Sequence, residues 1–167
     1  AVVARVSGVA FVGSAVRAPV APTRWQGSVD RVLQAGPVAG LFGTVPDNDL
    51  GRLTVMATFG RRPSLGDLRI VATSYDHLPR EVYWNAWPSI FAHDVREALA
   101  ERDDLDRLRV TVIVGARDRL TPVRCARDIV ASFPNAELII VPDVGHQLML
   151  EDPTALVRLR AQMLRRV

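Results

Sequence analysis

One carboxylate and one histidine, 28 positions apart, are the residues of this sequence best suited to do chemistry together. Asp118 lies in the run GARDRLTP, just after an apolar stretch that ends at Val114, and His146 lies in VPDVGHQLMLEDP, just after one that ends at Val141. A carboxylate that accepts a hydrogen bond from an imidazole orients the ring and stabilises its protonated form. The pair therefore indicates general acid–base catalysis, provided that the fold brings the two side chains together.

Two predicted strands and two predicted helices must position this pair. Residues 109–114 (RVTVIV) and 137–141 (ELIIV) have the apolar, β-branched character of buried strands. Between them we expect a helix over 122–133, with Thr121 as its N-cap and Pro122 as its first residue, and after them a closing helix over 153–166. Strand–helix–strand–helix at this spacing predicts an α/β fold with a parallel sheet. In such sheets, functional residues gather at the carboxyl ends of the strands.

The first part of the chain predicts one more strand and then a long helical block. Residues 8–12 (GVAFV) read as a strand buried on both faces. From residue 29 to 106 the apolar residues recur at helical spacing, with helices expected over 49–59, 64–74 and 80–101. We expect residues 1–20 and 107–167 to form one domain and residues 21–106 to form a helical insertion in it.

The motifs around the pair resemble those of a known family. A strand is followed by G-x-x-D-x-x-T-P, the next strand by P-x-x-G-H, and the last helix begins after E-x-P; these elements are Gly115, Asp118, Thr121 and Pro122, then Pro142, Gly145 and His146, then Glu151 and Pro153. This arrangement is similar to the C-terminal portion of α/β-hydrolases. The resemblance implies a partial α/β-hydrolase fold: about three parallel strands, the sixth to the eighth of the family, with flanking helices and an inserted helical cap.

The resemblance also implies a reaction. In the family, the histidine takes the proton of a nucleophile and later activates water, while the acid fixes the tautomer of the histidine. We therefore expect His146 and Asp118 to serve in the hydrolysis of a carboxylic ester or a related small acyl substrate, with no cofactor and no metal ion. Trp84, Trp87 and Phe91, on one predicted cap helix, are candidates to line an acyl pocket, and packing of the cap onto the sheet is the alternative role for them.

The nucleophile of the family is not recognisable in this sequence. No glycine is followed by serine two residues later, so the G-x-S-x-G elbow is absent. Ser64, in RPSLG, lacks the first glycine and forms a helix-capping pattern with Asp67. The chain begins at Ala1 without an initiator Met, and we expect it to be cut from a longer sequence whose upstream part carries the nucleophile and the oxyanion donors. The chain alone is then expected to be inactive and marginally stable.

A second hypothesis places the chain in another functional class. It would be a truncated or split-gene product that acts as a non-catalytic binding module and pairs with a separate N-terminal half. An in-frame stretch of DNA upstream of the Ala1 codon that encodes G-x-S-x-G would favour the first hypothesis, a hydrolase.

The composition and the charge of the chain bear on its possible binding partners and its location. The net charge is +3, and all 21 basic residues are arginines spread along the chain, which argues against a nucleic-acid surface. No stretch reaches the ~18 apolar residues of a membrane span. The apolar run over residues 6–16 could pass for a signal-peptide core, but no small-x-small cleavage site follows it cleanly, and a buried strand explains residues 9–12 equally well. The single cysteine, Cys125, is expected to be buried and inert, which fits a cytoplasmic protein.

Overall fold

The computed structural model describes residues 6–19, 53, 55–76, 92–102 and 104–165, together with positions 82, 86, 89 and 90. The chain forms two compact units. One comprises Ala1–Pro19, Thr58–Arg61 and Asp94–Val167, and the other comprises Val20–Ala57 and Arg62–His93.

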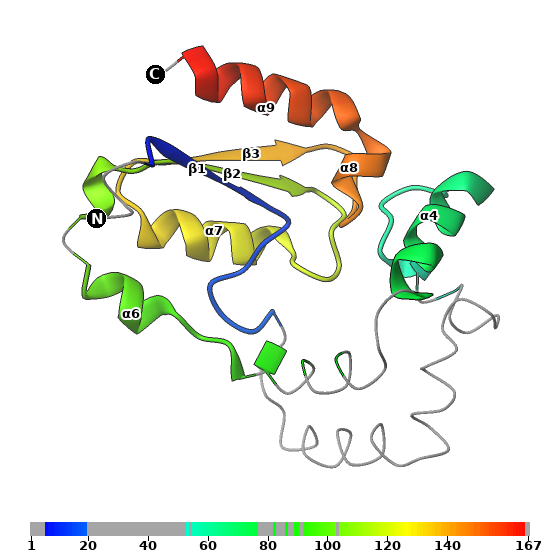
Figure 1. Cartoon of the computed structure of the whole chain (residues 1–167), viewed down its shortest axis with the longest axis horizontal. Helices are drawn as coiled ribbons and strands as arrows, with labels where there is room; N and C mark the ends of the chain where they lie inside the picture. Colours follow the sequence, from blue (N-terminus) through cyan, green and yellow to red (C-terminus); the bar gives the residue numbers. More distant parts are fainter. Residues whose placement is uncertain are drawn as a thin grey trace. The chain divides into compact units, whose positions relative to one another are not determined.

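The first unit is built on a three-stranded parallel sheet. Its strands are β1 (Gly8–Val12), β2 (Arg109–Gly115) and β3 (Ala136–Val141), in the spatial order β1-β2-β3 (Figure 1). Gly8 pairs with Arg109 at one end of the β1–β2 ladder. The β1–β2 and β2–β3 ladders are both parallel, so all three strands run the same way and their carboxyl ends lie at one edge of the sheet. The α/β fold with about three parallel strands and flanking helices that the sequence predicts is confirmed in this unit.

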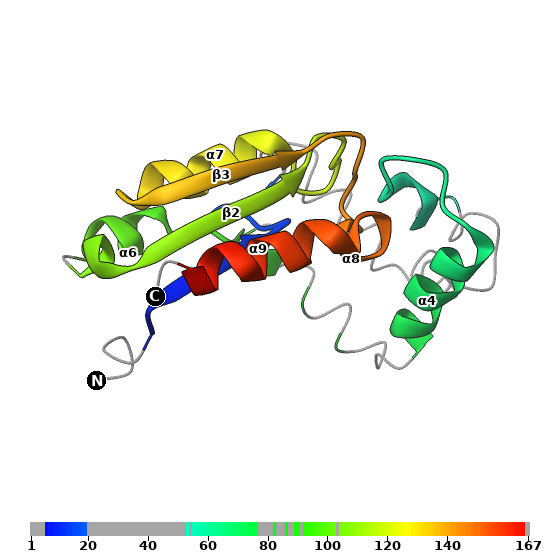
Figure 2. The same ribbon diagram turned by 90° about the horizontal axis from the view of Figure 1, so that it is seen from above.

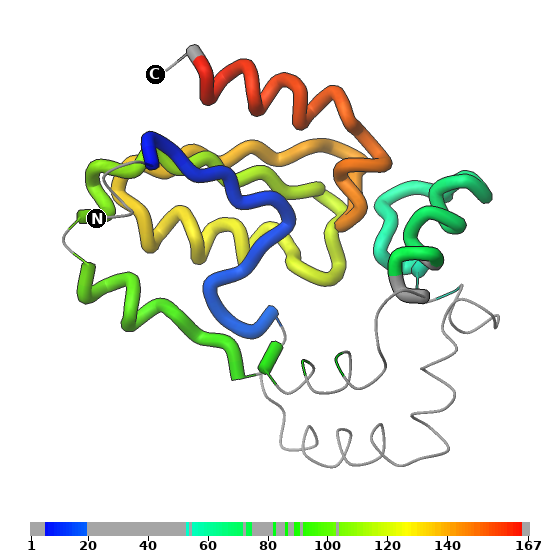
Figure 3. The backbone as a smooth tube through the Cα atoms, viewed as in Figure 1, coloured from blue at the N-terminus to red at the C-terminus, as the bar shows by residue number. Residues whose placement is uncertain are grey.

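Helices cover both faces of this sheet. Figure 3 follows the chain from β2 through α7 (Val123–Ser132) into β3, and then through α8 (Leu148–Glu151) to α9 (Pro153–Arg165). Helix α7 lies on one face and α9 on the other (Figure 2). Two shorter elements, α6 (Arg96–Ala100) and the 3₁₀ turn η2 (Leu105–Arg107), precede β2.

The alternation of side chains along β2 creates a core on each face. Val110, Val112 and Val114 pack with Ala126 and Ile129 of α7, and all five are at most 2% exposed. Ile113, on the opposite face, packs with Leu148, Ala155 and Leu159 of α8 and α9. Each fully buried aliphatic side chain contributes about 1.5–3 kcal/mol relative to an exposed one, so β2 anchors both layers of helices.

Several sequence predictions are confirmed and others are wrong in detail. The first strand is found at Gly8–Val12, but the expectation that both its faces are buried is wrong, because none of its five residues is buried and Ala10 is exposed. The helix expected over 80–101 is interrupted, because His93–Val95 is not helical: Asp94 forms a β-bridge with Arg17 and the Val95 N–H donates to the Val16 carbonyl at 2.9 Å.

Among the other described helices, one was not expected and the others agree with the sequence predictions. Helix α8 was not expected, because residues 148–151 are too few to show a helical period. In the second unit, α4 (Leu65–Asp76) confirms the helix expected over 64–74, and residues 53 and 55–57 are helical within the predicted 49–59 segment. The segments expected to be helical over 29–48 lie outside the described residues. None of the helices in the described part of the chain is long and apolar enough to cross a membrane.

Candidate active site

Three loops meet at the carboxyl edge of the sheet and bring Asp118 and His146 together. Gly13 follows β1, Asp118 follows β2 and His146 follows β3. Asp118 Oδ2 lies 3.0 Å from His146 Nδ1; the Asp118 side chain is fully buried, and that of His146 is 28% exposed. Gly13 has a φ of 52°, and a Cβ atom there would lie 3.4 Å from two ring atoms of His146. Gly13 thus lets the chain turn closely beside the ring.

The carboxylate of Asp118 accepts hydrogen bonds at both of its oxygens. Oδ1 accepts from the backbone N–H groups of Leu120 and Thr121, at 2.9 and 2.8 Å. Oδ2 accepts from the Thr121 hydroxyl at 2.9 Å and faces His146 Nδ1. A buried carboxylate is costly unless its oxygens are hydrogen-bonded, and here the turn after β2 supplies the donors. The same donors fix the direction in which Asp118 faces the histidine.

Thr121 has a different role from the one predicted. It was expected to be the N-cap of the following helix, but α7 begins at Val123 with Pro122 at the N-cap, and no side chain caps its first turn. The Thr121 hydroxyl is 2.9 Å from Asp118 Oδ2 and 3.2 Å from His146 Nδ1 instead. Since this hydroxyl donates to Asp118, its oxygen is the acceptor toward Nδ1–H. Thr121, Asp118 and His146 therefore form a closed hydrogen-bonded set.

This set determines which nitrogen of the imidazole can act as a base. A proton on Nδ1 satisfies the Asp118 carboxylate and the Thr121 oxygen together. The lone pair of the neutral ring then lies on Nε2. An imidazole held in this tautomer by a carboxylate is the arrangement that accepts a proton from a hydroxyl or a water molecule.

The loop that carries His146 is held by a segment distant in sequence. The His146 N–H donates to the Thr58 carbonyl at 2.7 Å, and Gln147 Nε2 donates to the Thr58 hydroxyl at 3.1 Å. The Gly145 N–H donates to Glu151 Oε1 at 2.8 Å. Neither Thr58 nor this contact of Glu151 was predicted. Glu151 stands in the E-x-P motif, so the sequence singled out this residue but did not indicate its hydrogen-bond partners. For Thr58, no sequence pattern indicated a contact with a loop 89 positions away.

The loops after β2 and β3 are also joined to each other. The Ala116 N–H donates to the Val141 carbonyl and the Arg117 N–H donates to the Val144 carbonyl, both at 2.8 Å. A Cβ atom on Gly115 would lie 2.2 Å from the Val144 oxygen, so only glycine allows this approach. These backbone contacts set the separation between the loop of Asp118 and the loop of His146.

The remaining predicted residues are not part of this arrangement. Trp84, Trp87 and Phe91 lie outside the described residues. Ser64 belongs to a capping pair, since its Oγ accepts from the Asp67 N–H at 3.1 Å. Cys125 is 3% exposed, as expected, and burial raises the pKa of its thiol. Among the described residues, no group of three His, Cys, Asp or Glu side chains could hold a metal ion.

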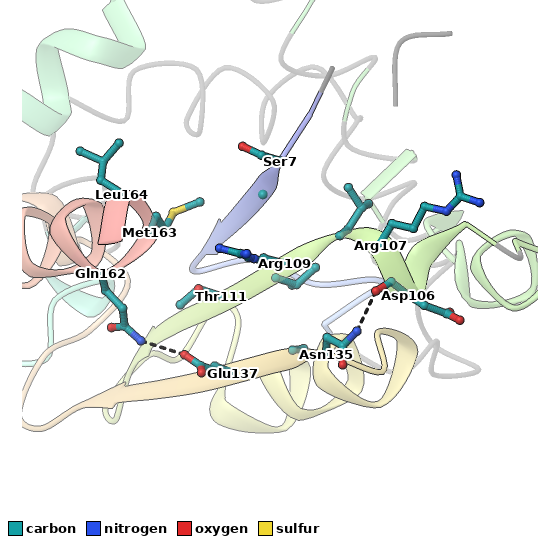
Figure 4. Close-up of a pocket in the computed structure, with 14 residues that line it drawn as sticks. Ser7, Asp106, Arg107, Arg109, Thr111, Asn135, Glu137, Gln162, Met163 and Leu164 are labelled. Carbon is teal, nitrogen blue, oxygen red and sulfur yellow. Dashed lines mark hydrogen bonds between the residues drawn. The ribbon is translucent and has the colours of Figure 1, made fainter. Parts of the chain in front are cut away.

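A hollow of about 840 Å³ lies at the other end of the sheet. Gly8, Arg109 and Ala136, the first residues of the three strands, contribute to its lining. Hydrogen bonds from Gln162 to Glu137 and from Asn135 to the Asp106 carbonyl bridge its walls (Figure 4). The hollow is therefore separated from Asp118 and His146 by the length of the strands.

Comparisons with known proteins agree with this fold. Among solved structures, the chain resembles the enol-lactonase from Burkholderia xenovorans LB400, with a TM-score of 0.69 and 17% identity over 96% of this chain and 57% of the other. It resembles the esterase from Exiguobacterium antarcticum with a TM-score of 0.68 and 12% identity, over 95% and 57% of the two chains. A hydrolase from Pseudomonas aeruginosa PA01 gives a TM-score of 0.65 and 20% identity, over 96% and 56%.

The chain thus spans little more than half the length of these structures. No curated protein sequence matches it. A family profile, that of the "Alpha/beta hydrolase family", matches residues 1–159, nearly the whole chain. On this match and on the parallel sheet described above, the chain belongs to the alpha/beta hydrolase family.

Proposed function

We propose that Asp118 and His146 are the acid and the base of a catalytic triad that hydrolyses carboxylic esters or related small acyl substrates. The observation that carries the proposal is the 3.0 Å contact between His146 Nδ1 and the buried carboxylate of Asp118, at the carboxyl edge of a parallel sheet. Two structures that the chain resembles are described as an esterase and an enol-lactonase, and hydrolysis of an ester or a lactone breaks the same kind of acyl C–O bond.

In this proposal Nε2 of His146 moves the protons. It accepts the proton of a nucleophile while the nucleophile bonds to the acyl carbon, and it then gives that proton to the departing alcohol. It next takes a proton from a water molecule, whose oxygen bonds to the acyl carbon. The bond from the acyl carbon to the nucleophile then breaks, Nε2 returns the proton to the nucleophile, and the acid is released. Asp118 holds the ring in the required tautomer and stabilises the imidazolium formed in each step.

The nucleophile is proposed to lie upstream of this chain, in a protein of which the chain is one part. The proposal rests on the absence of a G-x-S-x-G motif from the sequence and on the share of the related structures that the chain spans. Treatment of the 167-residue chain with a fluorophosphonate probe is then expected to leave it unlabelled. Labelling of Ser64, or of any other serine of the chain, would contradict the proposal.

The roles of the pair are tested by substitution in the natural protein that contains the chain. Asp118→Asn and His146→Gln are expected to lower kcat for a p-nitrophenyl ester by about 10⁴-fold, because either change removes the correctly oriented base. His93→Gln, a change at an exposed histidine, is the matched control and should retain the wild-type rate. Wild-type rates in both site variants would refute the triad. A protein that hydrolyses no ester with any variant would instead favour the non-catalytic binding module.

We also propose residues 21–106 as a cap, with Trp84, Trp87 and Phe91 in contact with the acyl chain. Support comes from the sequence alone, in the apolar character of one predicted cap helix. Substitution of these three residues by alanine should raise KM more for long acyl esters than for acetate. An equal effect on both esters would favour the alternative, in which they only pack the cap.

A further inference from the structure

Glu151 is a buried carboxylate that has no part in the proton transfers proposed above. The residue is 4% exposed and is the last residue of α8. Its Oε1 accepts from the Gly145 N–H at 2.8 Å, and its Oε2 accepts from the N–H groups of Gly60 and Arg61, at 2.8 and 3.2 Å. The Arg61 guanidinium also donates to the backbone carbonyl of Glu151. One side chain therefore binds two backbone segments about 85 positions apart.

Both of these segments control the backbone of His146. Gly145 directly precedes the histidine, and the segment of Gly60 and Arg61 continues from Thr58, whose carbonyl accepts the His146 N–H at 2.7 Å. Glu151 thus holds the histidine loop directly, through Gly145, and indirectly, through the segment that binds the His146 N–H.

The chemistry of these contacts requires a carboxylate. All three backbone groups are donors, and both oxygens of an ionised carboxylate are acceptors. The amide of glutamine has one acceptor oxygen and one donor nitrogen, so Glu151→Gln directs an NH₂ group at a backbone N–H on one side of the contact. A shorter aspartate keeps both acceptors but cannot reach both segments at once.

We propose that Glu151 is a positioning residue for His146, which holds the imidazole against Asp118. This inference rests on the proposed function of His146 as the base. Because Glu151 acts through the backbone at Gly145 and Thr58, its loss shifts the ring of His146 without touching a reacting atom. A displacement of about 1 Å of a catalytic group can lower the rate about a hundredfold.

The first test compares Glu151→Gln with Asp152→Asn in the natural protein that contains the chain. The control removes a neighbouring carboxylate charge, and asparagine can still accept the Ala155 N–H that Asp152 Oδ1 now binds at 3.2 Å. We expect Glu151→Gln to lower kcat by about ten- to a hundredfold with little change in KM, since the change misplaces the base. Asp152→Asn should leave both constants unchanged. Equal kinetic constants for Glu151→Gln and the wild-type protein would overturn the inference.

A second readout does not depend on activity. Nitrogen-15 NMR of the neutral imidazole of His146 should show the Nδ1–H tautomer in the wild-type protein and in Asp152→Asn, and a mixture of tautomers in Glu151→Gln. An unchanged His146 spectrum in Glu151→Gln overturns the inference. If the wild-type protein hydrolyses no ester, the proposed function fails, but this spectral change still shows that Glu151 positions His146.

A third variant separates positioning from a purely structural role. Glu151→Asp keeps the charge and is expected to retain the circular dichroism spectrum of the wild-type protein, with an intermediate kcat and an intermediate tautomer ratio. If both Glu151 variants lose the folded spectrum, the carboxylate is needed for folding itself, and the positioning role is overturned.

Discussion

Substitution of Gly145 by alanine offers a direct measure of how tightly the histidine loop is packed. A Cβ atom at this position would lie 2.3 Å from the Gly60 nitrogen, 2.5 Å from the Thr58 oxygen and 2.6 Å from the Phe59 carbonyl carbon. Ordinary van der Waals contact begins near 3.4 Å, so the two backbone segments must separate by about 1 Å. All of the contacting atoms belong to the backbone, and no flexible side chain can move aside.

The cost of Gly145→Ala has two parts. Overpacking of a close contact costs about 1–3 kcal/mol. A separation of about 1 Å also lengthens the 2.7 Å bond from the His146 N–H to the Thr58 carbonyl beyond hydrogen-bonding range. The loss of this bond adds about 1 kcal/mol. We therefore expect Gly145→Ala to lower the free energy of unfolding by about 2–4 kcal/mol.

A denaturant titration followed by circular dichroism measures this change. Gly66→Ala is the matched control, because a Cβ atom there would meet only the Ser64 hydroxyl, at 3.5 Å, near the start of α4. Alanine is the better helix former by up to about 1 kcal/mol, so this variant should be as stable as the wild-type protein or more stable. If Gly145→Ala unfolds at the wild-type denaturant concentration, the close packing of the histidine loop on residues 58–60 is refuted.

Three further predictions follow from other contacts. Thr121→Val removes the hydroxyl that donates to Asp118 Oδ2, which should lower the free energy of unfolding by about 1.5–3 kcal/mol, with recovery in Thr121→Ser, as measured by denaturant titration. Hydrogen bonds from Arg96 lower the pKa of Asp94 from 3.8 to about 2, so its stabilising effect is present above pH 3.8 and lost as the pH falls to about 2. Asp94→Asn should therefore flatten the acid side of the stability–pH curve, and an unchanged curve would contradict this. Cys125 is 3% exposed, and its thiol should react with a chromogenic disulfide reagent only after unfolding. Reaction of this thiol in the native protein would contradict the prediction.

Local patterns were sufficient to locate the sheet and the acid–histidine pair. The strands at Gly8–Val12, Arg109–Gly115 and Ala136–Val141 follow from short apolar runs between glycine, proline and polar residues. The places of Asp118 and His146 after two parallel strands follow from the rule that such strands end at one edge. These features were predictable because each depends on a few consecutive residues.

Features that depend on distant contacts were not predictable in the same way. Residues 93–95 leave the helical pattern because Asp94 and Val95 bind the chain after β1, 77 or more positions earlier, and the sequence shows only continuing helical spacing there. The exposure of β1 depends on which elements pack against its two faces. Helix α8 is too short to have a detectable period.

The same distinction applies within the candidate site. The sequence by itself determined that a carboxylate and a histidine follow neighbouring strands, because residue type and strand position are local properties. Only the tertiary structure decided that the Thr121 hydroxyl binds Asp118 instead of capping a helix, and that Glu151 joins Gly145 to Gly60. The physical reason is that a hydrogen bond depends on where donors and acceptors meet in space, and that is settled only when the layers of helix and sheet have packed.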